Sequence, residues 1–238
     1  MIINGIKIEL FKLKRTGIYW TLFTVPILFT LVSGVLYVGA TKAGYDVLRA
    51  VTFQMFLSFI YPLLIGVITA LIVRMERKNS GLNNLLISPI PRGQLYLNKM
   101  LILALLNLFI VTAIHLVLLF YILIFDVDGF VFKELLIHFI SIWLSGCLIS
   151  SIQLLFSFKF SGILMPISLC TILTISGLFV ITSPKLSIIH LWVYPVMSAF
   201  NGYNIPLIII VSLLLTCLFT LIGVYYFRTK WISEVGKH

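Results

Sequence analysis

Long apolar segments without charge alternate with short polar ones along the whole chain. Each of the first five apolar segments is about 25 residues long, and a helix needs about 20 residues to cross the hydrocarbon layer of a membrane. None of them alternates apolar and polar residues as the strands of a membrane barrel do. The pattern therefore predicts an all-α polytopic membrane protein with a single transmembrane domain over residues 1–238. We expect six membrane-spanning helices, at residues 17–39, 52–73, 100–124, 135–158, 160–182 and 205–227.

The last apolar segment, residues 186–227, is long enough for two crossings. Its first half is interrupted by Pro195 and by a polar stretch that begins at Asn201. Trp192 is a residue type enriched where the membrane meets water. We therefore expect residues 186–200 to form a short helix that is partly inserted from the outer side and does not cross.

Charge supports this reading and gives an orientation. Hydrophobic residues make up 61% of the chain and charged residues 10%, whereas a soluble domain carries about 25% charged residues. Basic residues collect on the inner side of membrane proteins. The arrangement of six spans therefore predicts a cell-membrane protein with both termini in the cytoplasm. The excess of Lys and Arg does not indicate a nucleic-acid partner, because these residues are dispersed between the apolar segments. Of the 17 basic residues, the outer segments hold only Lys42, Arg49, Lys133 and Lys185.

Residues 1–15 are amphipathic at the spacing of a helix, with the basic side chains largely off the apolar face. This arrangement predicts a helix that lies on the inner membrane surface, with its cations near anionic headgroups. The alternative is an ordinary basic flank that only orients the first span. The apolar face consists of Ile2, Ile3, Ile6, Leu10 and Leu13.

The predicted spans lack the residues that membrane enzymes and ion-coupled transporters need. They contain no Asp, Glu, Lys or Arg, and proton-coupled transport usually requires a buried carboxylate. The chain has neither an H-E-x-x-H zinc motif nor a phosphate-binding loop of the P-loop type. Its three cysteines lie in separate apolar segments and suggest neither a disulfide nor a metal site. We therefore expect no catalytic residue, no metal and no cofactor on this chain.

Four polar side chains stand out within the spans. We expect them to form hydrogen bonds between helices, although contact with a polar substrate is an alternative. His115 could act as a base only if a serine such as Ser145 lay beside it, and no nucleophile motif surrounds that serine. The four are Gln54, Asn107, His115 and Gln153.

The longest polar segment, residues 74–99, joins the second and third predicted spans on the cytoplasmic side. Asn79 or Ser80 can cap a short helix, and Pro89 ends it because proline breaks the helical bonding. Such a helix has an apolar edge that should dock on lipid headgroups or on a protein. The edge consists of Leu82, Leu85 and Leu86.

The order of residues in this segment resembles the type-2 ABC export permeases. The resemblance implies that the segment is a coupling helix, which fits a cleft on a separate ABC ATPase subunit, and that ATP is bound by that partner. It also agrees with six spans and a partly inserted outer segment. The ATPase-coupling residues that the resemblance implies are Glu76, Gly81, Leu82, Leu85, Leu86, Pro89 and Lys99.

Within that family, the segments Glu76–Ser80, Leu85–Arg92 and Tyr96–Lys99 are most similar to lantibiotic-immunity permeases. The resemblance implies a transporter in which two permeases, identical or different, work with ABC ATPase subunits. It would expel a peptide antibiotic from the membrane of the cell that produces it. The substrate-binding residues are not indicated. Alternatives are a type-2 exporter of another drug, lipid or ion, a membrane immunity protein that does not transport, and an intramembrane enzyme.

Overall fold

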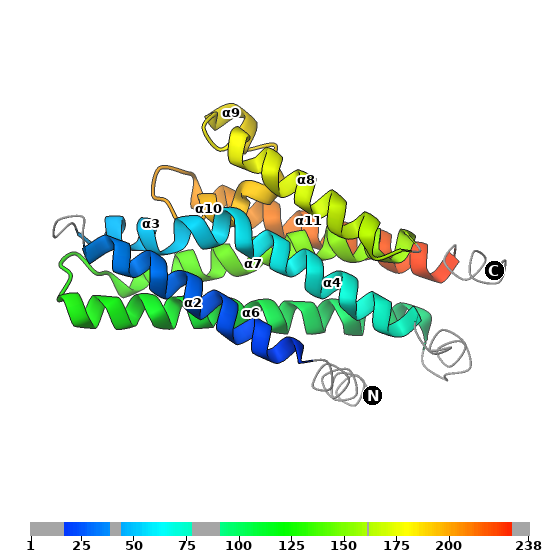
Figure 1. Ribbon diagram of the computed structural model, residues 1–238. Coiled ribbons are helices and arrows are strands. Elements are labelled where there is room, and N and C mark those ends of the chain that lie inside the picture. Colours follow the sequence, from blue (N-terminus) through cyan, green and yellow to red (C-terminus); the bar gives the residue numbers. More distant parts are fainter. Residues whose placement is uncertain (1–16, 39–43, 78–90, 161, 230–238) are drawn as a thin grey trace.

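The chain folds into a bundle of long helices that run roughly side by side (Figure 1). A computed structural model describes residues 17–38, 44–77, 91–160 and 162–229, and within these ranges all regular structure is helical, as predicted. Residues 1–15 and the loop at 78–90, for which we predicted two further helices, lie outside the described residues. The elements are α2 (Ile18–Val38), α3 (Tyr45–Met55), η1 (Phe56–Ile60), α4 (Tyr61–Arg77), α6 (Arg92–Phe125), α7 (Phe132–Lys159), α8 (Leu164–Val180), α9 (Pro184–Ser187), η2 (Leu191–Val193), α10 (Tyr194–Met197) and α11 (Ile205–Thr229).

Four helices in the described ranges are long and apolar enough to cross a membrane: Tyr45–Arg77, Arg92–Phe125, Phe132–Lys159 and Ile205–Thr229. The shorter apolar helices Trp20–Val35 and Leu164–Val180 coincide with the first and fifth predicted spans. Length and composition thus support a multi-pass membrane protein. The number of six crossings stays a prediction.

The bundle has two ends that matter for function (Figure 1). At the end that we call the loop end, residues 78–90 connect α4 with α6. At the opposite end, called the hairpin end here, a short turn connects α6 with α7, and the backbone N–H of Tyr45 donates to the carbonyl of Asp128.

The helix from Tyr45 to Arg77 is interrupted by the five-residue π-helix η1. At its end the N–H of Tyr61 bonds to the carbonyl of Phe56, five residues earlier. Pro62 follows immediately and has no N–H to offer, so regular α-helical bonding cannot continue through this turn.

The helices approach one another closely where glycines meet tyrosines. A Cβ atom on Gly146 of α7 would lie 2.0 Å from the hydroxyl oxygen of Tyr61, and one on Gly223 of α11 would lie 2.1 Å from that of Tyr96. Both tyrosines are buried. Small residues allow helices in a membrane to pack this closely, and here they fix α7 against α4 and α11 against α6.

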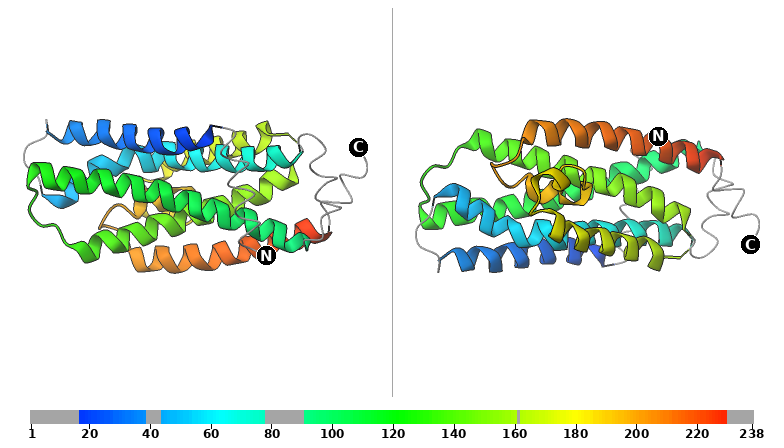
Figure 2. Two further views of the ribbon diagram at one scale, coloured as in Figure 1. Left: turned by 90° about the horizontal axis from the view of Figure 1, so that it is seen from below. Right: turned by 90° about the horizontal axis from the view of Figure 1, so that it is seen from above.

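The segment before α11 differs from the single short helix that we expected. It forms α9 and, after a turn, η2, which continues directly into α10, and Figure 2 shows it lying over the bundle between α8 and α11. Trp192, Tyr194 and Met197 are buried in it. Irregular backbone is tolerated at membrane depth only where protein surrounds it or where it lines a cavity, and this segment is both partly buried and part of a cavity wall.

Candidate functional site

Two of the predicted coupling residues meet at the loop end. Glu76, in the last turn of α4, and Lys99, near the start of α6, form an ion pair with 2.9 Å between Oε1 and Nζ. Their side chains are 3% and 1% exposed. The other predicted coupling residues, at 81–89, fall outside the described residues and stay predictions: Gly81, Leu82, Leu85, Leu86 and Pro89.

The pairing of Glu76 with Lys99 was not predicted, although the sequence held a signal for it. Residues of opposite charge stand at the two ends of one loop, and each lies next to a long apolar run. Leaving one charge buried without its partner costs about 3–5 kcal/mol. The pair therefore holds the two helices that flank the loop in a fixed relation.

Arg77 joins the same end of α4 to the end of α7. Its Nη2 donates to the carbonyls of Ser157, at 3.1 Å, and of Phe158, at 2.9 Å. Its Nη1 donates to the carbonyl of Phe160. The last carbonyls of a helix have no partner within it, and a cation there also interacts favourably with the helix dipole.

An aromatic cluster adds α11 to this group of helices. The rings of Tyr96, Phe158 and Phe227 come from α6, α7 and α11. Their centroids lie 5.7 Å apart for Tyr96 and Phe158, and 4.9 Å apart for Phe158 and Phe227. At the loop end four helices are thus joined by an ion pair, a capped helix terminus and ring packing, so a force on residues 78–90 would reach them together.

The hairpin end holds a second buried polar group, centred on Arg49 of α3. Its side chain is 1% exposed. Its Nε donates to the carbonyl of Ala199 at 3.0 Å, and its Nη2 donates to Asp46 Oδ1 and to Asn201 Oδ1, both at 2.9 Å. The guanidinium also lies 5.0 Å from the ring centroid of Tyr45. Arg49 therefore ties α3 to the segment that leads into α11.

His138 and Ser141 of α7 bind the same segment. The two ring nitrogens of His138 lie 2.6 Å from the carbonyl oxygen of Ser198 and 3.1 Å from Asn201 Oδ1. The hydroxyls of Ser141 and Ser198 are 2.7 Å apart. From sequence we had placed Arg49 in an outer loop and had not singled out His138, because their partners lie far away along the chain.

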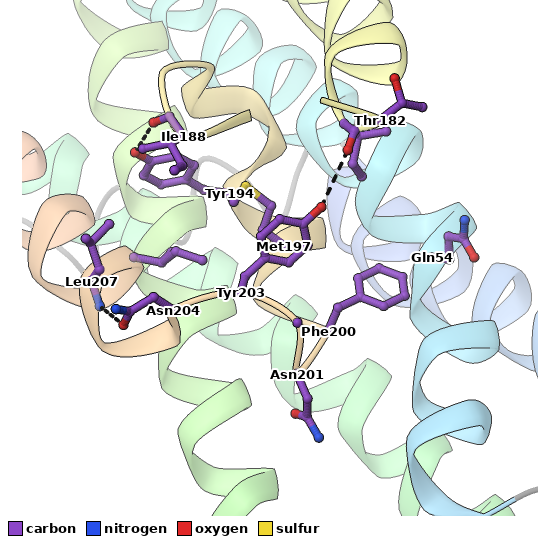
Figure 3. A pocket seen from close by; sticks show the side chains of 13 residues that line it. Gln54, Thr182, Ile188, Tyr194, Met197, Phe200, Asn201, Tyr203, Asn204 and Leu207 are labelled. Carbon is purple, nitrogen blue, oxygen red and sulfur yellow. Dashed lines mark hydrogen bonds between the residues drawn. The ribbon is translucent and has the colours of Figure 1, made fainter. Parts of the chain in front are cut away.

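A cavity of about 720 Å³ lies beside this polar group (Figure 3). It is bounded by α3, by the end of α8 and by the chain from α10 to the start of α11. Its size falls in the range of ligand pockets, about 300–1,000 Å³. None of its lining residues is Asp, Glu, Lys or Arg. The polar and aromatic lining includes Gln54, Thr182, Tyr194, Phe200, Tyr203 and Asn204.

Gln54 is the span residue that faces this cavity. Its side chain is exposed, and it forms no hydrogen bond within the described ranges. An amide in an apolar setting is unfavourable without a hydrogen-bonding partner. Its position therefore fits the alternative that we left open, contact with a polar group of a substrate.

Two other span residues do bond between helices, as predicted. Asn107 Nδ2 donates to Ser150 Oγ at 2.7 Å, and Gln153 Nε2 donates to the carbonyl of Pro166 at 2.6 Å. These bonds connect α6 with α7 and α7 with α8.

His115 and Ser145 instead bond to the backbone of their own helices. His115 Nδ1 lies 2.8 Å from the carbonyl oxygen of Val111, and Ser145 Oγ donates to the carbonyl of Ile142 at 2.8 Å. The prediction that His115 forms a hydrogen bond between helices was therefore wrong for its Nδ1 atom. Its ring packs at 5.0 Å against Phe53 and Phe139.

Comparison with known proteins relates most of the chain to one family. Residues 5–177 match a family described as "ABC-2 family transporter protein". This range extends from the N-terminal residues into α8. It includes α4 and α6, the two helices that residues 78–90 connect. No curated protein matches the chain significantly.

Proposed function

Since the chain belongs to the ABC-2 family of transporter proteins, as a membrane permease component, we propose that it is one half of an exporter that expels a peptide antibiotic from the cell membrane. Permeases of this family generally pair with ABC ATPase subunits. We propose a dimer of two permeases, identical or different, that carries two ATPase subunits. A lantibiotic is the substrate that the sequence resemblance favours.

The observation that carries the coupling part of this proposal is the Glu76–Lys99 pair. It joins α4 and α6 on either side of residues 78–90. In the proposed mechanism, ATP binding closes the two ATPase subunits and displaces this loop. Because the helices around it are joined, they move as a unit and open or close the space between the two permeases.

The cavity at the hairpin end supports an amphipathic substrate. Aromatic and aliphatic side chains with a few neutral polar groups line it, and no charged side chain does. A proton or metal ion would need charged or closely spaced ligands, whereas apolar side chains of a peptide would find apolar surface here. At about 720 Å³ the cavity would hold only part of such a peptide. The proposed topology of six spans, with both termini cytoplasmic, puts this cavity on the outer side.

The docking of the loop is tested by the double substitution Leu85→Asp, Leu86→Asp. Burying each leucine in a partner's cleft is worth about 1.5–3 kcal/mol, and a carboxylate there is strongly unfavourable. We expect the ATPase subunit to be lost on co-purification, and peptide resistance with it. The matched control, Leu85→Met with Leu86→Met, should keep both. Normal insertion with full ATPase binding and full resistance in the Asp variant would contradict the proposal.

The cavity is tested separately by Gln54→Leu, which replaces the polar amide by an apolar group of similar size. Losing one hydrogen bond to the substrate is worth about 1–3 kcal/mol, so stimulation of ATP hydrolysis by the peptide should need roughly 5- to 150-fold more peptide. ATPase association should not change, because Gln54 lies far from the loop end. An unchanged peptide requirement would argue against this cavity. Resistance that persists with an inactive ATPase would instead favour an immunity protein that does not transport.

A further inference from the structure

A second, smaller cavity lies at the loop end, between the end of α4 and the connection from α7 to α8. Its volume is about 160 Å³. Arg74 and Arg77, one helical turn apart on α4, both line it, together with Ser157 of α7 and the turn that leads into α8. The family assignment and the proposed export mechanism make no use of this cavity.

The cavity combines two positive charges with no negative one. Arg77 donates to carbonyls, which are neutral. Arg74 is exposed and has neither a hydrogen bond nor an ion pair within the described part of the chain. None of the lining residues is acidic, and Glu76, between the two arginines in sequence, is paired with Lys99. An anionic ligand would complete this charge arrangement.

Ser157 supplies a second, independent indication of a ligand. Its side chain is 3% exposed, and its hydroxyl has no hydrogen-bond partner among the described residues. A buried hydroxyl without a partner is unfavourable, because it has lost its hydrogen bonds to water. Because Ser157 lines the cavity, an oxygen of a bound anion could accept this hydroxyl's hydrogen.

We propose that this cavity binds a phosphate group, held by Arg74, Arg77 and the Ser157 hydroxyl. The volume of about 160 Å³ is roughly five times the share of one water in the liquid, which suits a phosphate group and excludes a peptide. Arginine recognises phosphate through charge-assisted hydrogen bonds. The source that fits best is an anionic phospholipid.

The surroundings favour a lipid headgroup over free phosphate. Basic pockets between membrane helices on the cytoplasmic side are typical headgroup sites, and the loop end is the cytoplasmic end in the proposed topology. Ile163 is part of the cavity wall. Leu164 and Met165, which follow it in sequence at the start of α8, are 76% and 59% exposed. They offer apolar surface to the acyl chains beside a bound headgroup.

Native mass spectrometry of the detergent-purified permease, alone or with its ATPase, tests the site. The purified protein is loaded with phosphatidylglycerol, with phosphatidylcholine, or with inorganic phosphate. We expect phosphatidylglycerol to be retained at least tenfold more than phosphatidylcholine. Arg74→Gln should abolish that preference and Arg74→Lys should keep part of it. The control Arg92→Gln removes an exposed charge at the same end that does not line the cavity, and should leave the preference intact.

Ser157→Ala tests the site without changing any charge, so a general effect of charge cannot explain its result. Without lipid this variant should melt at or above the temperature of the parent protein, because an unpaired buried hydroxyl has been removed. The rise in melting temperature on adding phosphatidylglycerol should shrink. If inorganic phosphate protects and competes while the two lipids bind equally, the site is a phosphate site and its lipid assignment is wrong. Equal losses in Arg74→Gln and Arg92→Gln, or no preference for any phosphate compound, would overturn the proposal.

Discussion

The buried ion pair at the loop end permits a quantitative test of how α4 and α6 are held together. Lys99→Met leaves the carboxylate of Glu76 buried without this counter-charge. Glu76→Leu likewise leaves the ammonium group of Lys99 buried without the carboxylate. Each single change should destabilise the fold by about 3–5 kcal/mol, which is the usual result of removing one partner of a buried pair. Since about 1.4 kcal/mol is a factor of ten, the unfolding constant should rise roughly 100- to 4,000-fold.

The double variant Glu76→Leu with Lys99→Met should behave very differently. Replacing both partners by apolar residues of similar size removes the desolvation penalty of both charges and is often neutral or stabilising. Both residues make further interactions in the structure, so we expect a stability close to that of the parent protein and not above it. The coupling energy in this cycle should therefore be about as large as the two single effects added together.

The assay is reversible unfolding in mixed micelles, with a denaturing detergent as the variable and helix content as the signal. Lys133→Met, which removes an exposed cation at the start of α7, is the control and should change stability by less than about 1 kcal/mol. Single variants as stable as this control would show that the charges are not buried as described. Additive single effects would show that the two charges do not interact. Resistance measured on the stable double variant then separates a purely structural pair from one whose charges contact the ATPase.

The remaining predictions concern packing, topology and the π-helix. Gly146→Ala should lower the melting temperature, because its Cβ would lie 2.0 Å from the hydroxyl oxygen of Tyr61, and Tyr61→Phe in the same chain should restore only part of the loss, since the ring carbon that carried the hydroxyl would still be too close, at 2.9 Å. A cysteine at Asn83 should react in whole cells only with membrane-permeant reagents, and one at Asp128 also with impermeant ones; labelling of both from one side would rule out the six-span topology. Pro62→Ala supplies the missing N–H and should convert η1 towards regular α-helix, which hydrogen exchange of residues 56–62 would reveal as slower exchange; unchanged exchange would show that proline is not the cause of the π-helix.

Two of the long helices extend beyond the membrane spans that the sequence predicted for them. The predicted second span stopped at residue 73 because charged residues follow, yet α4 continues to Arg77. The predicted third span began at residue 100, whereas α6 begins at Arg92. In both cases a charge was taken as the border of the membrane segment. Lys99 is instead paired inside the protein, so its charge does not mark a helix end.

The polar sites were harder to predict, because their partners are remote in sequence. Asn201 lies beside Arg49, and Gly223 lies against Tyr96. Each residue type is visible in the sequence, but a single sequence does not indicate which distant residue will meet it. The segment before α11 is not one long helix, in keeping with its interruption by Pro195, and its failure to cross the membrane stays a prediction. Within α9, η2 and α10 this segment packs against α7 and α8, and such remote contacts are not visible in the sequence.

The two polar sites lie on one continuous element, and this suggests how a displacement at one end could reach the other. The helix Tyr45–Arg77 spans 33 residues, or about 50 Å at the rise of an α-helix. Glu76 near one end fixes it to α6, and Arg49 near the other fixes it to the chain that lines the large cavity. Between them lies η1, where the α-helical hydrogen bonding is interrupted, and π-bulges of this kind are frequent at functional sites. We infer that loop displacement is carried along this helix and changes the cavity through the Arg49–Asn201 contact. Pro62→Ala should then reduce peptide resistance without reducing ATPase binding, and unchanged resistance in a variant with a regularised helix would refute this route.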